Sequence, residues 1–211
     1  MEERINAYEK VSSPEELLSF MDEYIKYGIL GTDGKIYRDW ADDQDSKFQI
    51  ACQTKYALCD KARILNCGLG TCWDQVELER AWFKEHGYQI KTFFIWFHLD
   101  YRNNYCTHTY LVYEKDDKYY YFEHSDYKNE GIHEFDSYED AIKYQMSKHI
   151  EFHKARGLDV SDDILSHLEV MEYDIKEYGI NKDEYLDNIF NSKIVYQNNE
   201  FMEAYKNARK N

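Results

Sequence analysis

The feature that most constrains the fold is a run of three extended segments in the middle of the chain. Residues 88–98, 105–114 and 118–125 are rich in β-branched and aromatic side chains, which fit strands. The last two segments flank Asp116-Asp117, a two-residue turn typical of a β-hairpin. These segments therefore predict an antiparallel sheet of neighbouring strands.

Helical patterns precede and follow this run of strands. Capping residues and apolar spacings of three and four indicate helices in six segments: 14–27, 48–64, 71–86, 137–156, 182–191 and 199–210. Residues 28–45 are rich in Gly and Asp, with a turn expected at Asp33-Gly34. Residues 164–178 fit a helix, although their centre fits a strand equally well. Helices, then strands, then helices favour an α+β fold over a doubly wound parallel sheet.

Composition and charge exclude several classes of partner. The net charge of −15 repels phosphate backbones and anionic membranes, so nucleic acid is not expected as a partner. No apolar run reaches the roughly 18 residues of a membrane span. The five Cys contain no CxxC spacing, which argues against a zinc site, and no apolar signal sequence precedes them. We therefore expect free thiols and a cytoplasmic location, with no metal or organic cofactor.

Cys72 differs from the other cysteines in its place in the chain. It follows the Gly-containing segment 66–70 and occupies the first turn of the helix predicted at 71–86. Unpaired amides and the helix dipole at such a position favour a thiolate and can bind an oxyanion. The alternative interpretation, a small buried side chain at a tight helix–strand contact, remains open on this evidence.

The hairpin supplies a histidine and a carboxylate on one face of the sheet. If Asp116-Asp117 is the turn, paired residue numbers sum to 233, and His108, Tyr110, Glu123 and Ser125 share a face. Glu123 is then a diagonal neighbour of His108, within reach of its ring. A register shifted by one residue would instead bring forward His124 and Asp126.

A second pair of histidines has a spacing that could bind a metal ion. His149 and His153 are four residues apart on the helix predicted at 137–156. Because no neighbouring acidic residue completes a ligand set, a polar helix face is the favoured interpretation.

Two motifs resemble the transglutaminase-like cysteine fold. They are GTCWDQ around Cys72 and THTYLVYEKDDKYYYFEHS from Thr107 to Ser125, and the resemblance covers about residues 50–135. In that family a Cys at a helix N-terminus precedes a strand His and, fifteen residues later, an Asp. Cys72, His108 and Glu123 fall on these positions. The chain departs from the family in having Glu for Asp, Tyr110 for Trp, and His124 for the Pro that often follows the acid.

The resemblance implies a single domain, 1–211, in which an antiparallel sheet packs on a central nucleophile-bearing helix. Helical additions are expected at 1–49 and 136–211. Cys72 would attack a peptide or protein amide carbonyl, His108 would act as base and then acid, and Glu123 would orient His108. Trp73, Gln53 and Asn66 are candidates for the second oxyanion donor.

The possible functions differ in the molecule that accepts the acyl group from Cys72. Water gives a cysteine protease or amidase, which is the favoured interpretation, and an amine gives a transglutaminase or acyltransferase. If the triad is catalytically inactive, the fold would serve as a protein- or peptide-binding module.

Overall fold

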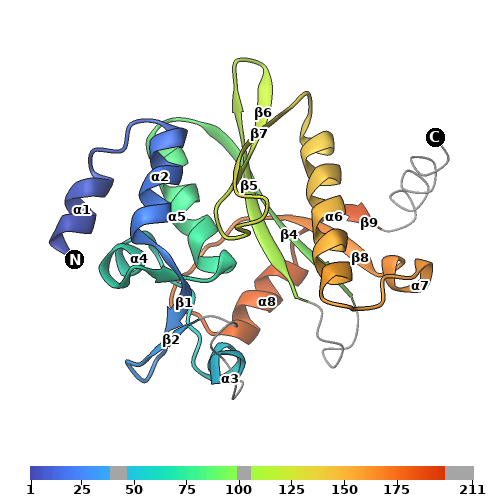
Figure 1. Cartoon of the computed structure of the whole chain (residues 1–211), viewed down its shortest axis with the longest axis horizontal. Coiled ribbons are helices and arrows are strands. Elements are labelled where there is room, and N and C mark those ends of the chain that lie inside the picture. Colours follow the sequence, from blue (N-terminus) through green and yellow to red (C-terminus); the bar gives the residue numbers. More distant parts are fainter. Residues whose placement is uncertain (39–46, 99–105, 198–211) are drawn as a thin grey trace.

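The larger of two sheets forms the centre of the computed structural model, which describes residues 1–38, 47–98 and 106–197 (Figure 1). Its six antiparallel strands have the order β7-β6-β5-β4-β8-β9. Their bounds are β4 Gln89–Phe97, β5 His108–Lys115, β6 Lys118–Glu123, β7 Gly131–Phe135, β8 Leu168–Tyr173 and β9 Lys193–Gln197. A smaller mixed sheet, ordered β2-β1-β3, contains β1 Lys26–Leu30, β2 Ile36–Arg38 and β3 Leu69–Gly70.

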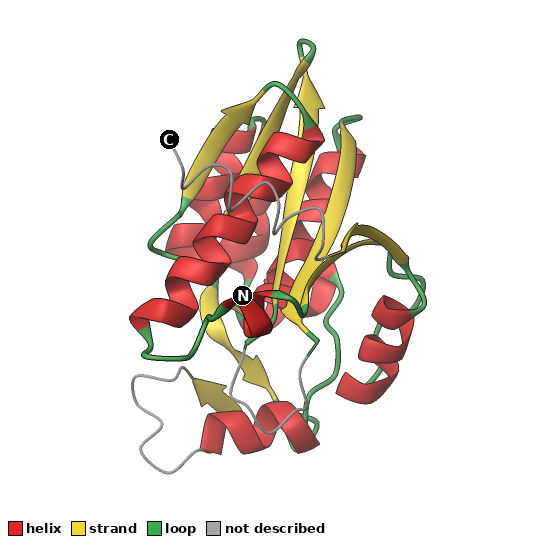
Figure 2. Ribbon diagram, turned by 90° about the vertical axis from the view of Figure 1, so that its right-hand side faces the viewer, coloured by secondary structure: helices red, strands yellow, loops and turns green. Residues whose placement is uncertain are grey.

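Helices cover both faces of the large sheet (Figure 2). The described residues form eight: α1 Glu2–Tyr8, α2 Pro14–Tyr24, α3 Lys47–Thr54, α4 Lys61–Cys67, α5 Cys72–Glu85, α6 Tyr138–Ala155, α7 Asp162–Leu165 and α8 Lys182–Phe190. Leu111 and Phe122 share a core cluster with Val76 and Phe83 of α5. The residues that alternate with these along the strands form a second cluster with α6. Successive side chains of a strand point to opposite faces of the sheet, so the two clusters lie on opposite faces. The α+β class with an antiparallel sheet is therefore confirmed.

The hairpin between β5 and β6 has the predicted register. Asp116 and Asp117 have φ angles of 53° and 61°, as a type I′ turn requires at both central positions. Lys115 pairs with Lys118 and Leu111 with Phe122. This register places Tyr110 and Tyr121 together on the face covered by α6.

Two of the predicted helices have different bounds in the structure. The helix expected at 14–27 ends at Tyr24, and the chain continues through the buried Ile25 into β1, where Ile29 is also buried. The helix expected at 48–64 is two helices, α3 and α4. Asp60 separates them by capping α4, since its Oδ1 accepts the Arg63 amide at 2.8 Å.

The additions expected to be helical also contain strands, so that prediction was wrong in detail. The segment 1–49 contributes β1 and β2, and the segment 136–211 contributes β8 and β9. Strand β8 pairs with β4 on one side and with β9 on the other, so it lies inside the large sheet. Leu168 and Met171 of β8 pack in different cores, which explains why its pattern was ambiguous between helix and strand.

Strand β3 also has no counterpart among the predicted elements. Strand β7 was not predicted, and the helix expected at 199–210 lies outside the described residues. Within the described ranges, no helix combines the length and apolar character that crossing a membrane requires.

Candidate active site

The N-terminus of α5 is fixed by a buried carboxylate. Asp74 accepts the amide and the hydroxyl of Thr71, each at 2.9 Å, in a capping arrangement. Its other oxygen accepts the Cys59 amide and the Tyr56 hydroxyl, also at 2.9 Å. These four donors anchor the first turn of α5 to the preceding segment, so the position of Cys72 is set by the fold.

The approach to this helix requires a glycine. A Cβ atom built at Gly70 would lie 3.0 Å from the Cβ of Asp74 and 3.2 Å from the Cγ of Gln75. Both contacts are tighter than packed side chains ordinarily allow. Gly70 therefore permits strand β3 to turn directly into α5 at Thr71.

His108 and Glu123 form a buried pair at one end of the β5–β6 hairpin. Nε2 of His108 lies 2.7 Å from Oε2 of Glu123, which is only 2% exposed. Burial lowers the pKa of His108, but the Glu123 charge and the hydrogen bonds to Cys72 and Glu123 outweigh it, so the pKa is raised well above its usual value. Burial raises the pKa of Glu123, but His108 outweighs that effect and lowers it. The favoured state is therefore imidazolium beside carboxylate.

Three further donors hold the Glu123 carboxylate. The Tyr121 hydroxyl donates to Oε2. The Ser125 hydroxyl and the Asp126 amide donate to Oε1, at 3.1 Å and 2.8 Å. A carboxylate with this many donors has little freedom to rotate. It therefore fixes the orientation of the His108 ring.

Cys72 meets this pair from the start of α5. It is 7% exposed, and its thiol is among the groups that raise the pKa of His108. Because Glu123 occupies Nε2 of His108, Nδ1 is the ring nitrogen left for the thiol. The structure thus brings together Cys72, His108 and Glu123, the three residues selected from the sequence.

The alternative pair from the shifted register lies elsewhere. His124 turns toward α5, where its Nδ1 lies 2.7 Å from Oε1 of Gln75. Gln75 in turn donates to the carbonyl of Gly70 at 2.9 Å. The side chain of Asp126 accepts from Asn129 and Lys128. Neither His124 nor Asp126 takes a position beside His108 equivalent to that of Glu123.

The three candidates for the second oxyanion donor make other contacts in the structure. The indole N–H of Trp73 donates to the Thr107 hydroxyl at 3.1 Å. The side-chain oxygen of Gln53 accepts from Lys182 at 3.0 Å. Asn66 is exposed on α4 and lines a separate cavity, described below. None of these contacts directs a donor to the Cys72 sulfur.

Two residues near Cys72 were missed in the sequence. Glu79, 3% exposed, lies two helical turns along α5, and burial followed by the Glu123 charge raises its pKa well above the usual value. Its spacing of seven from Cys72 places it on the same helix face, which was a usable signal. Tyr27 of β1 lies close enough to Cys72 for the charge of its thiolate to raise the pKa of Tyr27. Its strand was not predicted, so no sequence signal indicated this contact.

The histidine pair on α6 is buried, which corrects the expectation of a polar helix face. His149 and His153 are 4% and 0% exposed, and Phe97 stacks on the His149 ring. The helix carries them against the sheet because their positions continue the apolar stripe of Ile142 and Met146. Among the described residues, no group of three His, Cys, Asp or Glu side chains is placed to bind a metal ion.

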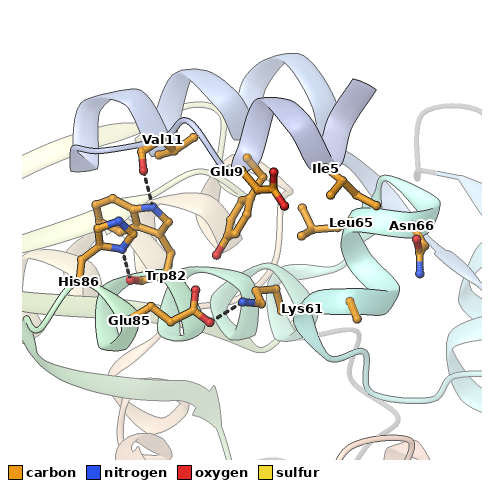
Figure 3. Close-up of a pocket in the computed structure, with 11 residues that line it drawn as sticks. Ile5, Glu9, Val11, Lys61, Leu65, Asn66, Trp82, Glu85 and His86 are labelled. Atoms are coloured by element: carbon orange, nitrogen blue, oxygen red, sulfur yellow. Dashed lines mark hydrogen bonds and ion pairs between the residues drawn. The ribbon is translucent and has the colours of Figure 1, made fainter. Parts of the chain in front are cut away.

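A separate cavity of about 480 Å³ lies near the C-terminal end of α5 (Figure 3). Trp82 and Glu85 of α5 line it with Ile5 of α1 and Leu65 of α4. Lys61 and Glu85 form an ion pair there. Cys72 begins the same helix and is not among the lining residues, so this cavity is distinct from the site at the N-terminus of α5.

Comparisons of the chain with protein-family models, with curated proteins and with solved structures found no match in any of the three.

Proposed function

We propose that the chain is a cysteine-dependent acyl-transfer enzyme that acts on peptide or amide bonds, with Cys72 as nucleophile, His108 as base and acid, and Glu123 as the group that orients His108. One observation carries the proposal. His108 lies between a buried carboxylate, 2.7 Å from its Nε2, and a thiol that begins a helix. This arrangement is the one that nucleophilic catalysis by cysteine needs.

The proposed reaction proceeds in two steps. The Cys72 thiolate, whose proton His108 holds, attacks the amide carbonyl and forms a carbon–sulfur bond. The imidazolium of His108 then protonates the leaving amine, and a thioester remains on Cys72. In the second step neutral His108 takes a proton from water, the resulting hydroxide attacks the thioester, and the carboxylic acid and the thiol are released.

Several features support this assignment. Glu123 raises the pKa of His108, which stabilises the imidazolium formed during the reaction. The amide of Cys72 occupies the first position of α5, where helix geometry provides no intrahelical partner, so it can donate to an oxyanion. The resemblance of GTCWDQ and THTYLVYEKDDKYYYFEHS to transglutaminase-like enzymes agrees with this order of residues. Water is the proposed acceptor, which makes the activity protease- or amidase-like.

The proposal is tested by competition between the five cysteines for a simple alkylating agent. The protein is treated with substoichiometric iodoacetamide at pH 7, and labelling at each Cys is measured by mass spectrometry. Cys72 should react much faster than the others, because burial raises the pKa of the Cys59, Cys67 and Cys106 thiols. Cys72→Ser should remove the fast phase, whereas the matched control Cys106→Ser should retain it. Labelling spread evenly over the cysteines would refute the enzyme assignment.

A further inference from the structure

The small sheet brings Tyr27 to the start of the nucleophile helix. Strand β1 pairs in parallel with β3, and in this register Tyr27 lies opposite Gly70. Gly70 is two residues before Cys72, and α5 begins directly after the intervening Thr71. A residue at position 27 is therefore held beside Cys72 by backbone pairing.

The Tyr27 hydroxyl lies close enough to the Cys72 thiol to interact with it electrostatically. Burial, followed by the charges of the neighbouring thiols of Cys72, Cys52 and Cys106, raises the pKa of Tyr27 well above its usual value. Tyr27 consequently keeps its proton at neutral pH. The ring packs 6.1 Å from that of Phe48, which limits its movement.

The proposed reaction requires donors to the oxygen that becomes negative when Cys72 attacks a carbonyl. The Cys72 amide supplies one donor, and oxyanion sites of acyl-transfer enzymes combine at least two such groups. The Trp73 indole donates to Thr107, and the side chains of Gln53 on α3 and Asn66 on α4 are exposed. In the tetrahedral intermediate, oxygen and sulfur are bonded to the same carbon. A hydroxyl that lies beside the sulfur before attack is thus close to the oxygen after it.

We propose that the Tyr27 hydroxyl is the second oxyanion donor of this site, a role that rests on the function proposed above. As the sulfur–carbon bond forms, the electron pair of the carbonyl π bond moves to oxygen, and the Tyr27 O–H donates a hydrogen bond to that oxygen. Tyr27 transfers no proton. When the intermediate collapses, the C=O bond re-forms, the leaving group departs, and the Tyr27 hydroxyl is released from the oxyanion.

The test separates reactions that form an oxyanion from reactions that do not. Acylation of Cys72 by p-nitrophenyl acetate passes through a tetrahedral oxyanion, whereas alkylation by iodoacetamide displaces iodide at a saturated carbon. Tyr27→Phe removes only the hydroxyl. It should slow acylation by about 10²-fold, the usual effect of losing one oxyanion donor, and change alkylation by less than about threefold. Tyr37→Phe is the matched control, because Tyr37 lies in the same small sheet and its hydroxyl donates to Asp33. It should change neither rate.

Each other outcome has a defined meaning. If Tyr27→Phe leaves acylation unchanged, or slows both reactions equally, Tyr27 is not an oxyanion donor, and the triad stands. If wild-type Cys72 reacts selectively with neither reagent, the proposed function fails first and the role of Tyr27 fails with it. Should Tyr27→Phe not fold, Tyr27→Gln is compared with Tyr27→Leu. The Gln variant keeps a donor and should acylate faster, and equal acylation rates would overturn the proposal.

Discussion

Nε2 of His149 lies 3.3 Å from Nε2 of His153, one helical turn away, with both rings buried between α6 and the sheet. A hydrogen bond between two imidazole nitrogens needs at least one neutral ring. Burial and then the His153 charge lower the pKa of His149 well below its usual value. Burial and then Arg156 lower the pKa of His153 to about 4. The folded protein therefore holds this pair neutral.

This pair predicts a loss of stability in mild acid. The unfolded chain binds protons at these histidines near pH 6.5, whereas the folded chain binds them only at lower pH. The free energy of unfolding should thus be at its plateau above pH 6.5 and fall as the pH drops toward 4, by up to about 1.4 kcal/mol per pH unit for each ring. Urea unfolding of wild type and His153→Gln at several pH values measures this slope. The variant should show a shallower slope, and identical slopes would contradict the prediction.

Glu123→Gln should separate charge from shape at the candidate site. Gln keeps the size of the side chain but loses the charge that raises the pKa of His108, so the imidazolium becomes less populated at pH 7. Alkylation of Cys72 by iodoacetamide should slow by roughly 10²-fold, without being abolished, because the helix N-terminus remains. Glu134→Gln, at an exposed carboxylate on the neighbouring strand β7, is the control and should alkylate at the wild-type rate. Equal rates for wild type and Glu123→Gln would remove Glu123 from the site.

Much of this site was predictable because it depends on local sequence patterns. The Asp116-Asp117 turn determines the hairpin register, and that register places Glu123 beside His108. Thr71 and Asp74 mark the start of α5, which places Cys72 at a helix N-terminus. Each of these conclusions requires residues separated by few positions in the chain.

The features that were missed depend on pairing between distant segments. Tyr27 reaches Cys72 only because β1 pairs with β3, and a two-residue strand has no periodicity of its own. Strand β8 joins the sheet beside β4, about 75 residues away in sequence, and its apolar residues on both faces hide the strand alternation. The burial of His149 likewise follows from the packing of α6 on the sheet, since histidine is compatible with both a surface and a core position.

Gly70→Ala should be costly because of the space around the turn into α5. The added methyl group would crowd Asp74 and Gln75, so α5 must shift. We expect a loss of about 1–3 kcal/mol in the free energy of unfolding, measured by urea titration, together with slower alkylation of Cys72. Gly87→Ala is an informative control. Gly87 has a φ of 77° but no neighbouring atom within 4 Å, so it should lose about 1 kcal/mol from backbone strain and leave Cys72 reactivity unchanged. Unaltered stability in Gly70→Ala would show that the turn tolerates a side chain.

Tyr110→Phe and Tyr121→Phe form a matched pair on adjacent strands. Both rings are fully buried on the α6 face, 5.3 Å apart, but their hydroxyls differ. The Tyr110 hydroxyl has no hydrogen-bond partner among the described residues, whereas the Tyr121 hydroxyl contacts Glu123 and, at 3.0 Å, Gln145. An unpaired buried hydroxyl costs free energy on folding, so Tyr110→Phe should leave stability unchanged or raise it by about 1 kcal/mol.

Tyr121→Phe should have the opposite effect. It removes one of the donors to the buried Glu123 carboxylate and a contact of the buried Gln145 side chain, which should lower the free energy of unfolding by about 1–3 kcal/mol. It should also slow alkylation of Cys72, because the carboxylate that orients His108 loses one of its donors. Thermal and urea unfolding of the two variants, combined with iodoacetamide kinetics, measure both effects. Equal losses of stability in the two variants would mean that ring packing, and not the hydrogen bond to Glu123, determines the contribution of Tyr121.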